Sequence, residues 1–178
     1  MTNEPKAATD DELESDTKVE AATNVLDRNR LRQIVRVWLG MAGVGGTLAI
    51  VSAFLPWVAL RAGDVQTISG IETGGDGFIT AGLGLLAVVL AARGWVRPEG
   101  PTRRTGTIIL VVGFFVLSVP ALDWADFRRT MIAVDATIAS LTTPEAGLYG
   151  TALGGLLAII GGWQLRRALR MQSRISPG

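Results

Sequence analysis

Residues 146–165 read AGLYGTALGGLLAIIGGWQL and contain no charged side chain. About 20 helical residues, rising 1.5 Å each, are needed to cross the roughly 30 Å hydrocarbon core of a bilayer. The stretch has that length, and its apolar residues do not alternate with polar ones as they would in a transmembrane β-strand. Because lipid offers the backbone no hydrogen-bond partner, we predict a membrane-spanning helix here.

Three further apolar stretches of the same kind precede this one. They are Val37–Leu60, Gly77–Val96 and Gly106–Leu122, with Ala146–Leu165 as the fourth. Apart from Arg93 near the end of the second stretch, the charges of the 178-residue chain lie in its tails and connectors, and the mean hydropathy is +0.36. We therefore predict an all-α integral membrane four-helix bundle over residues 24–170.

The two ends of the chain differ from this core in composition. Residues 1–20 contain seven carboxylates and two lysines, with few large apolar side chains. Such a segment buries too little apolar surface to fold, so residues 1–23 are predicted to be a disordered acidic tail. Residues 171–178 are predicted to be a C-terminal tail. The first apolar stretch is too long for a signal sequence and follows the acidic tail, so it is predicted to be a retained span.

Basic residues alternate from one side of the predicted bundle to the other. The tails and the middle connector, counted with Arg93 at the adjoining end of span two, hold 14 lysines and arginines, whereas the other two connectors hold 3. Basic connectors remain in the cytoplasm, which predicts cytoplasmic termini and outward-facing segments at 61–76 and 123–145. The outward segments carry seven carboxylates: Asp64, Glu72, Asp76, Asp123, Asp126, Asp135 and Glu145.

The five tryptophans indicate the same topology independently. They are Trp38, Trp57, Trp95, Trp124 and Trp163. Each lies at an end of a predicted span. Amphipathic rings prefer the headgroup level of a bilayer, so we interpret all five as interfacial anchors.

The fourth span also carries small residues at four-residue spacing. They are Gly150, Gly154, Ala158 and Gly162. This spacing places them along one stripe of a helix, where small side chains let a neighbouring helix approach closely. We interpret the stripe as a helix-packing surface within the bundle, and homodimerisation through it is the alternative.

Spans two and four share a local pattern. The segments Thr80-Ala81 and Gly84-Leu85-Leu86-Ala87 recur 71 residues later as Thr151-Ala152 and Gly155-Leu156-Leu157-Ala158. Spans one and three each have a proline near the outer end. The similarity suggests two tandem helical hairpins.

Residues 123–141 show a helical repeat of apolar side chains. Trp124, Phe127, Met131, Val134, Ile138 and Leu141 recur every three or four residues. We predict a short outer amphipathic helix that either extends span three or lies along the membrane interface, and that ends before Pro144. The pattern indicates no strand in the chain.

The chemical inventory excludes several classes of function. The chain has no cysteine and no histidine, which excludes disulfides, the usual zinc sites and haem bound through those residues. No charge lies in the middle of a span, which disfavours ion-coupled transport. We predict no enzymatic activity, no cofactor and no nucleic-acid partner. The outward carboxylates, Asp76, Asp123 and Asp126 among them, are the only chemical candidates, and solvated loop charge is favoured over a metal site.

Three short runs carry a family resemblance. Phe54-Leu55-Pro56-Trp57, Ser69-Gly70-Ile71-Glu72 and Gly75-Asp76-Gly77, followed by the glycine-rich second span, resemble small four-span prokaryotic membrane proteins. The resemblance covers roughly residues 40–95. It implies a bacterial or archaeal plasma membrane and no particular activity, because the function of those proteins is mostly unassigned.

Three functional hypotheses follow. The leading one is a non-catalytic accessory or assembly subunit, with the lipid bilayer and a membrane protein or a second copy of itself as partners. The second is a small-molecule or lipid transporter or channel with an outer vestibule near Pro56 and Pro120. The third is a membrane enzyme that uses the outward carboxylates.

Overall fold

The computed structural model describes residues 10–62, 64–72, 76–97 and 100–175. The remaining positions, including 1–9 and 176–178 of the predicted tails, lie outside the described residues, as do the side chains of residues 10–25. The described part of helix α1 begins at Asp10. The disorder expected for residues 1–23 stays a prediction.

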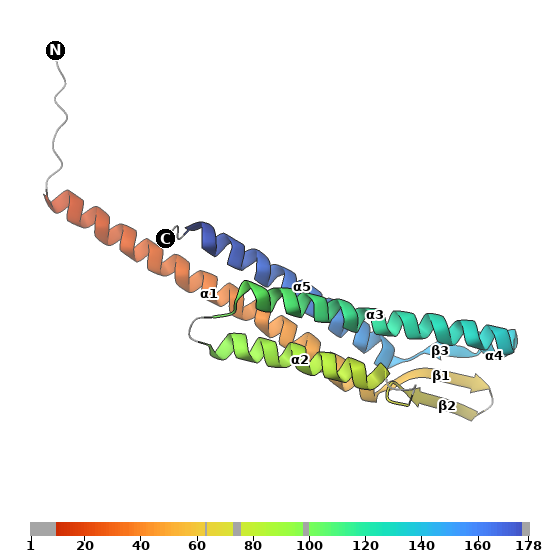
Figure 1. Cartoon of the computed structure of the whole chain (residues 1–178). Coiled ribbons are helices and arrows are strands. Elements are labelled where there is room, and N and C mark those ends of the chain that lie inside the picture. The colour runs from red at the N-terminus through yellow and green to blue at the C-terminus, as the bar shows by residue number, and fades with distance from the viewer. Residues whose placement is uncertain (1–9, 63, 73–75, 98–99, 176–178) are drawn as a thin grey trace, which may run out of the picture.

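Four long helices run side by side: α1 (Asp10–Phe54), α2 (Asp76–Val96), α3 (Arg103–Val134) and α5 (Ala146–Ile175). Each contains a segment long and apolar enough to cross a membrane, so the expectation of four such helices is confirmed. Figure 1 shows both chain ends and the α2–α3 connection at one end of the bundle. The strands and the short helix α4 (Ala136–Ser140) lie at the opposite end.

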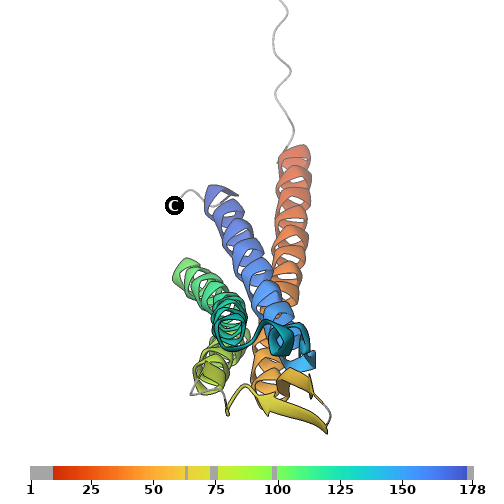
Figure 2. The same cartoon turned by 90° about the vertical axis from the view of Figure 1, so that its right-hand side faces the viewer.

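Helix α5 packs closely against both α1 and α3. A Cβ atom added to Gly154 would lie 2.6 Å from the Gly45 carbonyl oxygen, and one added to Gly162 would lie 2.7 Å from the Leu110 amide nitrogen. Both distances are too short for a side chain, so the helix backbones are in contact at these positions. Figure 2 shows α5 between α1 and α3. The glycines thus allow a dense bundle built on dispersion contacts.

The two helical hairpins α1–α2 and α3–α5 use equivalent glycine contacts. In the first, a Cβ on Gly84 would meet the Gly46 carbonyl oxygen at 2.7 Å. In the second, a Cβ on Gly155 would meet the Gly113 carbonyl oxygen at 3.0 Å and the Leu117 amide nitrogen at 2.7 Å. Gly84 and Gly155 are the matched positions of the sequence repeat. The tandem-hairpin interpretation of the sequence stays a prediction.

A three-stranded antiparallel sheet lies at the end away from the termini. Its strands are β1 (Pro56–Ala62), β2 (Asp64–Ser69) and β3 (Thr142–Pro144), in the order β2-β1-β3. The predictions that the chain has no strand and that its first helix reaches Leu60 are wrong. Helix α1 ends at Phe54, because Pro56 has no backbone N–H to continue the helix. The apolar run of β1 follows without a polar break, and periodicity does not separate such a run from a buried helix.

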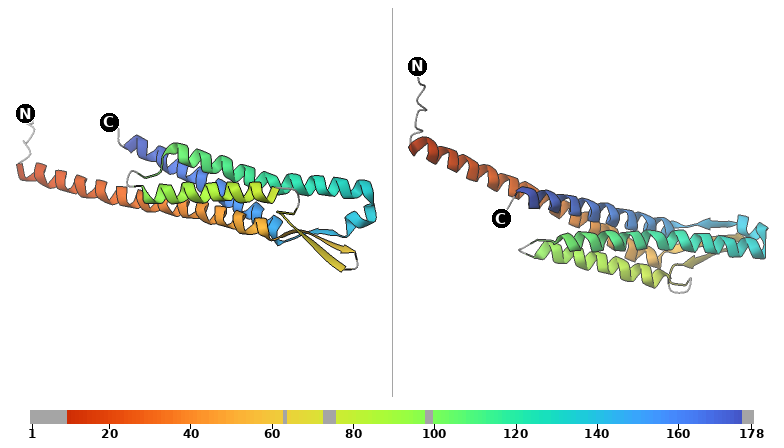
Figure 3. Two further views of the ribbon diagram at one scale, coloured as in Figure 1. Left: turned by 60° about the horizontal axis from the view of Figure 1, so that its bottom comes forward. Right: turned by 45° about the horizontal axis from the view of Figure 1, so that its top comes forward.

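Helix α3 continues as one helix well past the end of its apolar segment. It passes through Pro120 and extends twelve residues beyond Leu122, about 18 Å at 1.5 Å per residue. The predicted outer amphipathic segment is therefore an extension of span three, followed by α4. Figure 3 shows this extension running past the end of α2 toward the strands. We call the three strands, α4 and residues 123–134 of α3 the cap.

Candidate binding cavity in the cap

A cavity of about 370 Å³ lies where the cap meets the ends of the helices. Strands β1 and β2, the segment after β2, and helices α2, α3 and α5 all contribute to its wall. The lining residues are Trp57, Val58, Ile68, Glu72, Asp76, Asp123, Trp124, Asp126, Phe127, Thr130, Met131 and Leu148. Four are carboxylates and three are aromatic.

Helix geometry brings the carboxylates together. Asp123 and Asp126 are three residues apart on α3 and so share one face of that helix. Asp76 is the first residue of α2 and lines the cavity together with Asp123. Burial, together with the neighbouring Asp76 and Asp126 carboxyl groups, raises the pKa of Asp123 to about 7. The Oδ2 atom of Asp123 is buried without a hydrogen-bond partner. The cavity therefore contains an acceptor that the described residues leave unsatisfied.

Glu72 is held at the rim by the end of β2. The backbone N–H and the hydroxyl of Ser69 donate to its Oε2 atom at 2.8 and 3.0 Å. These two hydrogen bonds, the backbone one foremost, hold the pKa of Glu72 below its ordinary value. The fourth carboxylate of the wall is thus anchored in its ionised form.

The aromatic part of the wall is rigidly placed. Trp57 is 1% exposed and donates its indole N–H to the Ser52 carbonyl oxygen at 2.9 Å. A Cβ on Gly70 would overlap the Trp57 ring, so a glycine is needed where the chain passes over the indole. Trp124 and Phe127 stack with ring centroids 6.4 Å apart and an interplanar angle of 21°. The cavity therefore presents fixed aromatic surfaces beside its carboxylates.

The helical bundle beneath the cavity has a largely apolar interior. Among the described residues, the buried polar side chains of the long helices are the short hydroxyls Ser52, Thr80 and Thr151. Thr151 donates to the Gly147 carbonyl oxygen of its own helix at 2.9 Å, whereas Ser52 and Thr80 have unpartnered hydroxyl oxygens. A cluster of buried residues, Ala49, Ala87, Val112 and Val116, packs between the helices. The described residues form no polar path through this core.

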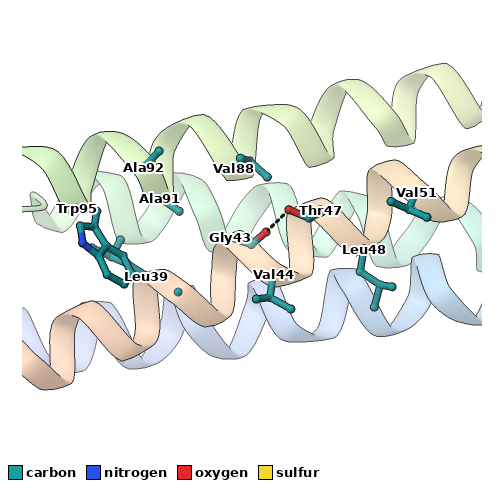
Figure 4. A pocket seen from close by; sticks show the side chains of 11 residues that line it. Leu39, Gly43, Val44, Thr47, Leu48, Val51, Val88, Ala91, Ala92 and Trp95 are labelled. Atoms are coloured by element: carbon teal, nitrogen blue, oxygen red, sulfur yellow. Dashed lines mark hydrogen bonds between the residues drawn. The ribbon is translucent and has the colours of Figure 1, made fainter.

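A second concave surface is a groove of about 550 Å³ between α1 and α2. Its walls are almost wholly apolar, and Figure 4 shows it running from Trp95 at one end to Val51 at the other. The Thr47 hydroxyl on this surface is satisfied by the Gly43 carbonyl oxygen at 3.0 Å. The groove therefore provides an apolar concave surface for packing rather than polar groups for binding or catalysis.

The small-residue stripe predicted in the fourth span faces two neighbours rather than one. Gly150 and Gly154 lie against α1, at Ser52 and Gly45 respectively, whereas Gly162 lies against α3. Ala158 is buried between them, where added Cβ atoms on Gly45 and on Gly113 would both touch it. A four-residue step turns a helix by about 40° more than one full turn, so the stripe winds from one neighbour to the next.

The predicted tryptophan anchors also separate into groups. Trp95 and Trp163 are 51% and 62% exposed, and Trp38 is half-buried. Trp124 lines the cap cavity, and Trp57 is buried in the core. The ring of Trp57 is buried in the protein beside Gly70 and Gly147, and its interpretation as an interfacial anchor stays a prediction.

The sequence analysis singled out the carboxylates but did not predict that Asp76 and Asp123 lie close together. Asp76 and Asp123 are far apart in the chain, and no local spacing predicts their contact.

Among the described residues, no group of three or more carboxylates is placed to hold a metal ion. No protein-family model matches the chain, and no curated protein matches it.

Proposed function

We propose that the protein is a multi-pass membrane protein that acts as a non-catalytic accessory or assembly subunit. The observation that carries this proposal is the apolar groove between α1 and α2, in which we propose that a transmembrane helix of a partner packs. The apolar core of the described residues supports a packing role over a conducting one, because carriers and pumps place polar or ionisable groups inside their bundles.

The distribution of charge supports a plasma-membrane orientation with cytoplasmic termini. Exposed arginines precede the first apolar segment at the termini end: Arg30, Arg32 and Arg36. The cap end carries Arg61, Arg128 and Arg129 beside a larger number of carboxylates. Under the positive-inside rule, the cap would face outward. The resemblance to small prokaryotic membrane proteins suggests a bacterial or archaeal membrane.

The glycines of the groove are not needed to pack α1 on α2. A Cβ on Gly43 would lie 3.6 Å from Ala91 Cβ, and one on Gly40 would lie 3.5 Å from the Trp95 ring, both ordinary contacts. Gly46, which does pack on α2, would meet the Gly84 carbonyl oxygen at 2.6 Å. The first two glycines keep the groove open, and small residues on such a surface let a partner helix approach closely.

Purification of the full chain in mild detergent tests the proposal. The tagged wild-type protein is expected to retain a stoichiometric membrane partner, and Gly43→Leu is expected to lose it by filling the groove. Gly82→Leu is the matched control, because Gly82 is exposed on α2 with nothing within 4 Å of an added Cβ. A monodisperse wild-type monomer, or equal loss of the partner in both variants, would contradict the proposal.

A second candidate is a small-molecule or lipid transporter or channel. The cap cavity favours it, because the cavity is lined by Trp57, next to Pro56, and by Asp123, three residues after Pro120. These prolines mark the region where an outer vestibule was expected. Solute flux into proteoliposomes that depends on the purified chain would support transport. Binding without flux would leave the cavity as a recognition site.

A further inference from the structure

We propose that the cap cavity binds a small organic cation, a primary amine or a quaternary ammonium compound. The inference is independent of the proposed partner helix, because the cavity and the α1–α2 groove share no lining residue. It also requires no transport. Either proposal can therefore fail while the other stands.

The size of the cavity fits a small ligand. Its volume of about 370 Å³ lies near the lower end of the roughly 300–1,000 Å³ that small-molecule sites occupy. Two strands and three helices contribute to the wall, so a bound molecule would be surrounded by elements that are far apart in the chain.

The charge of the wall has one sign. Four carboxylates line the cavity, and none of its described lining residues is a lysine or an arginine. Carboxylates that share a partly enclosed space repel one another, and a bound cation would relieve that repulsion. Burial and the neighbouring Asp76 raise the pKa of Asp123 to about 7, and a bound cation would favour the ionised form. The Oδ2 atom, which is buried without a hydrogen-bond partner, would then accept from the N–H group of a primary amine. Asp76 is a neighbour of the same side chain in the cavity wall.

The aromatic side chains of the cavity can contact the methyl or methylene groups of such a cation. The stacked pair of Trp124 and Phe127 lines the cavity beside Asp126. Aromatic rings attract organic cations through their negative faces, and quaternary ammonium compounds are recognised in this way. Trp57 adds a third ring, which its hydrogen bond to Ser52 holds in place.

The same geometry disfavours a metal ion. Calcium requires six to eight oxygen ligands at about 2.3–2.6 Å, and the described residues contain no group of three carboxylates so placed. The carboxylates are instead spread around a cavity of molecular size. An organic cation, which combines a diffuse charge with an apolar surface, matches this arrangement of carboxylates and rings.

The test measures binding of two probes, choline and putrescine, to the full-length chain in detergent or nanodiscs. Intrinsic tryptophan fluorescence reports on the site directly, and isothermal titration calorimetry gives the stoichiometry. Saturable binding of at least one probe is expected, with binding at least about tenfold weaker for dimethylbutanol, the neutral carbon isostere of choline. Magnesium chloride serves as the divalent control and is expected to compete poorly.

Two substitutions locate the site. Asp126→Asn and Trp124→Leu are each expected to weaken binding about tenfold. Asp126 is exposed, so its substitution preserves the fold even if changes at the more buried Asp123 do not. Glu145→Gln is the matched control, because it removes a carboxylate of the cap end that does not line the cavity. It is expected to bind the probes as the wild type does.

Three results would overturn the proposal. The first is no saturable binding of either probe by the folded wild-type chain. The second is equal binding of choline and its neutral isostere, which would show an apolar site. The third is an equal loss of binding in Glu145→Gln and Asp126→Asn, which would show attraction by the general charge of the surface.

Discussion

In the bundle, the backbones of α1 and α5 approach so closely that a Cβ on Gly154 would lie 2.6 Å from the Gly45 carbonyl oxygen. In the cap, the largest fully buried side chain of the described residues, Trp57, fills the space beside the strands. Packing of α1 on α5 requires glycines, which have no side chain. Packing of the cap instead uses one large side chain, that of Trp57. The two regions therefore differ in how they pack: close backbone contact at glycines in the bundle, and a large buried ring in the cap.

The largest expected effect removes the centre of the cap. Trp57→Ala deletes a buried indole and its hydrogen bond to Ser52, and large-to-small changes of this kind cost about 3–5 kcal/mol. Trp163→Ala is the control, because that ring is 62% exposed, and a change within about 0.5 kcal/mol is expected. Thermal unfolding in detergent measures both. Equal losses would show that the buried and exposed tryptophans do not differ in role.

The next effect adds a side chain to the bundle. Gly154→Ala places a methyl group against the α1 backbone, and overpacking costs about 1–3 kcal/mol. Gly82→Ala adds the same methyl where nothing lies within 4 Å, so it is expected to leave the unfolding temperature unchanged or slightly raised. A Gly154→Ala protein as stable as the wild type would show that α1 and α5 can separate without cost.

A smaller effect is expected for the energetic coupling between the two hairpin contacts of the bundle. Gly84→Ala and Gly155→Ala are each expected to be destabilising, because an added Cβ would lie 2.7 Å from backbone atoms of α1 and α3 respectively. Their nearest contacts are not shared, so the double variant should equal the sum of the single ones within about 0.5 kcal/mol. Unfolding of all three variants in one detergent measures this coupling. A larger coupling would mean that the hairpins do not pack independently.

The smallest effect concerns the rim of the cap cavity. Ser69 stabilises the ionised form of Glu72, so the folded-state pKa of this carboxyl lies below the unfolded value. Its contribution to stability is therefore complete above the ordinary glutamate pKa and is lost as the pH falls through the lowered value. Glu72→Gln should lower the unfolding temperature slightly at neutral pH and have a progressively smaller effect in acid. A pH-independent difference would contradict this account.

Local sequence predicted the bundle well and the cap poorly. Each long helix has an uninterrupted apolar segment, and that signal needs no knowledge of neighbours. Strand β1 was hidden because it continues the apolar run of the first span. The Gly63-Asp64 pair between Leu60 and the β-branched run of β2 was the available hairpin signal. The sequence shows the small-residue stripe, but its division between α1 and α3 depends on how these two helices flank α5.

The sequence of each segment therefore determines the four apolar helices and the difference in charge between the two ends of the bundle. Lipid compatibility and the placement of charge are properties of single segments. The meeting of Asp76 with Asp123, the burial of Trp57 and the cavity between them come from contacts among segments far apart in the chain. Those contacts arise only when the helices pack and the sheet closes over them. The sequence of one segment does not determine its distance from another segment in the folded protein.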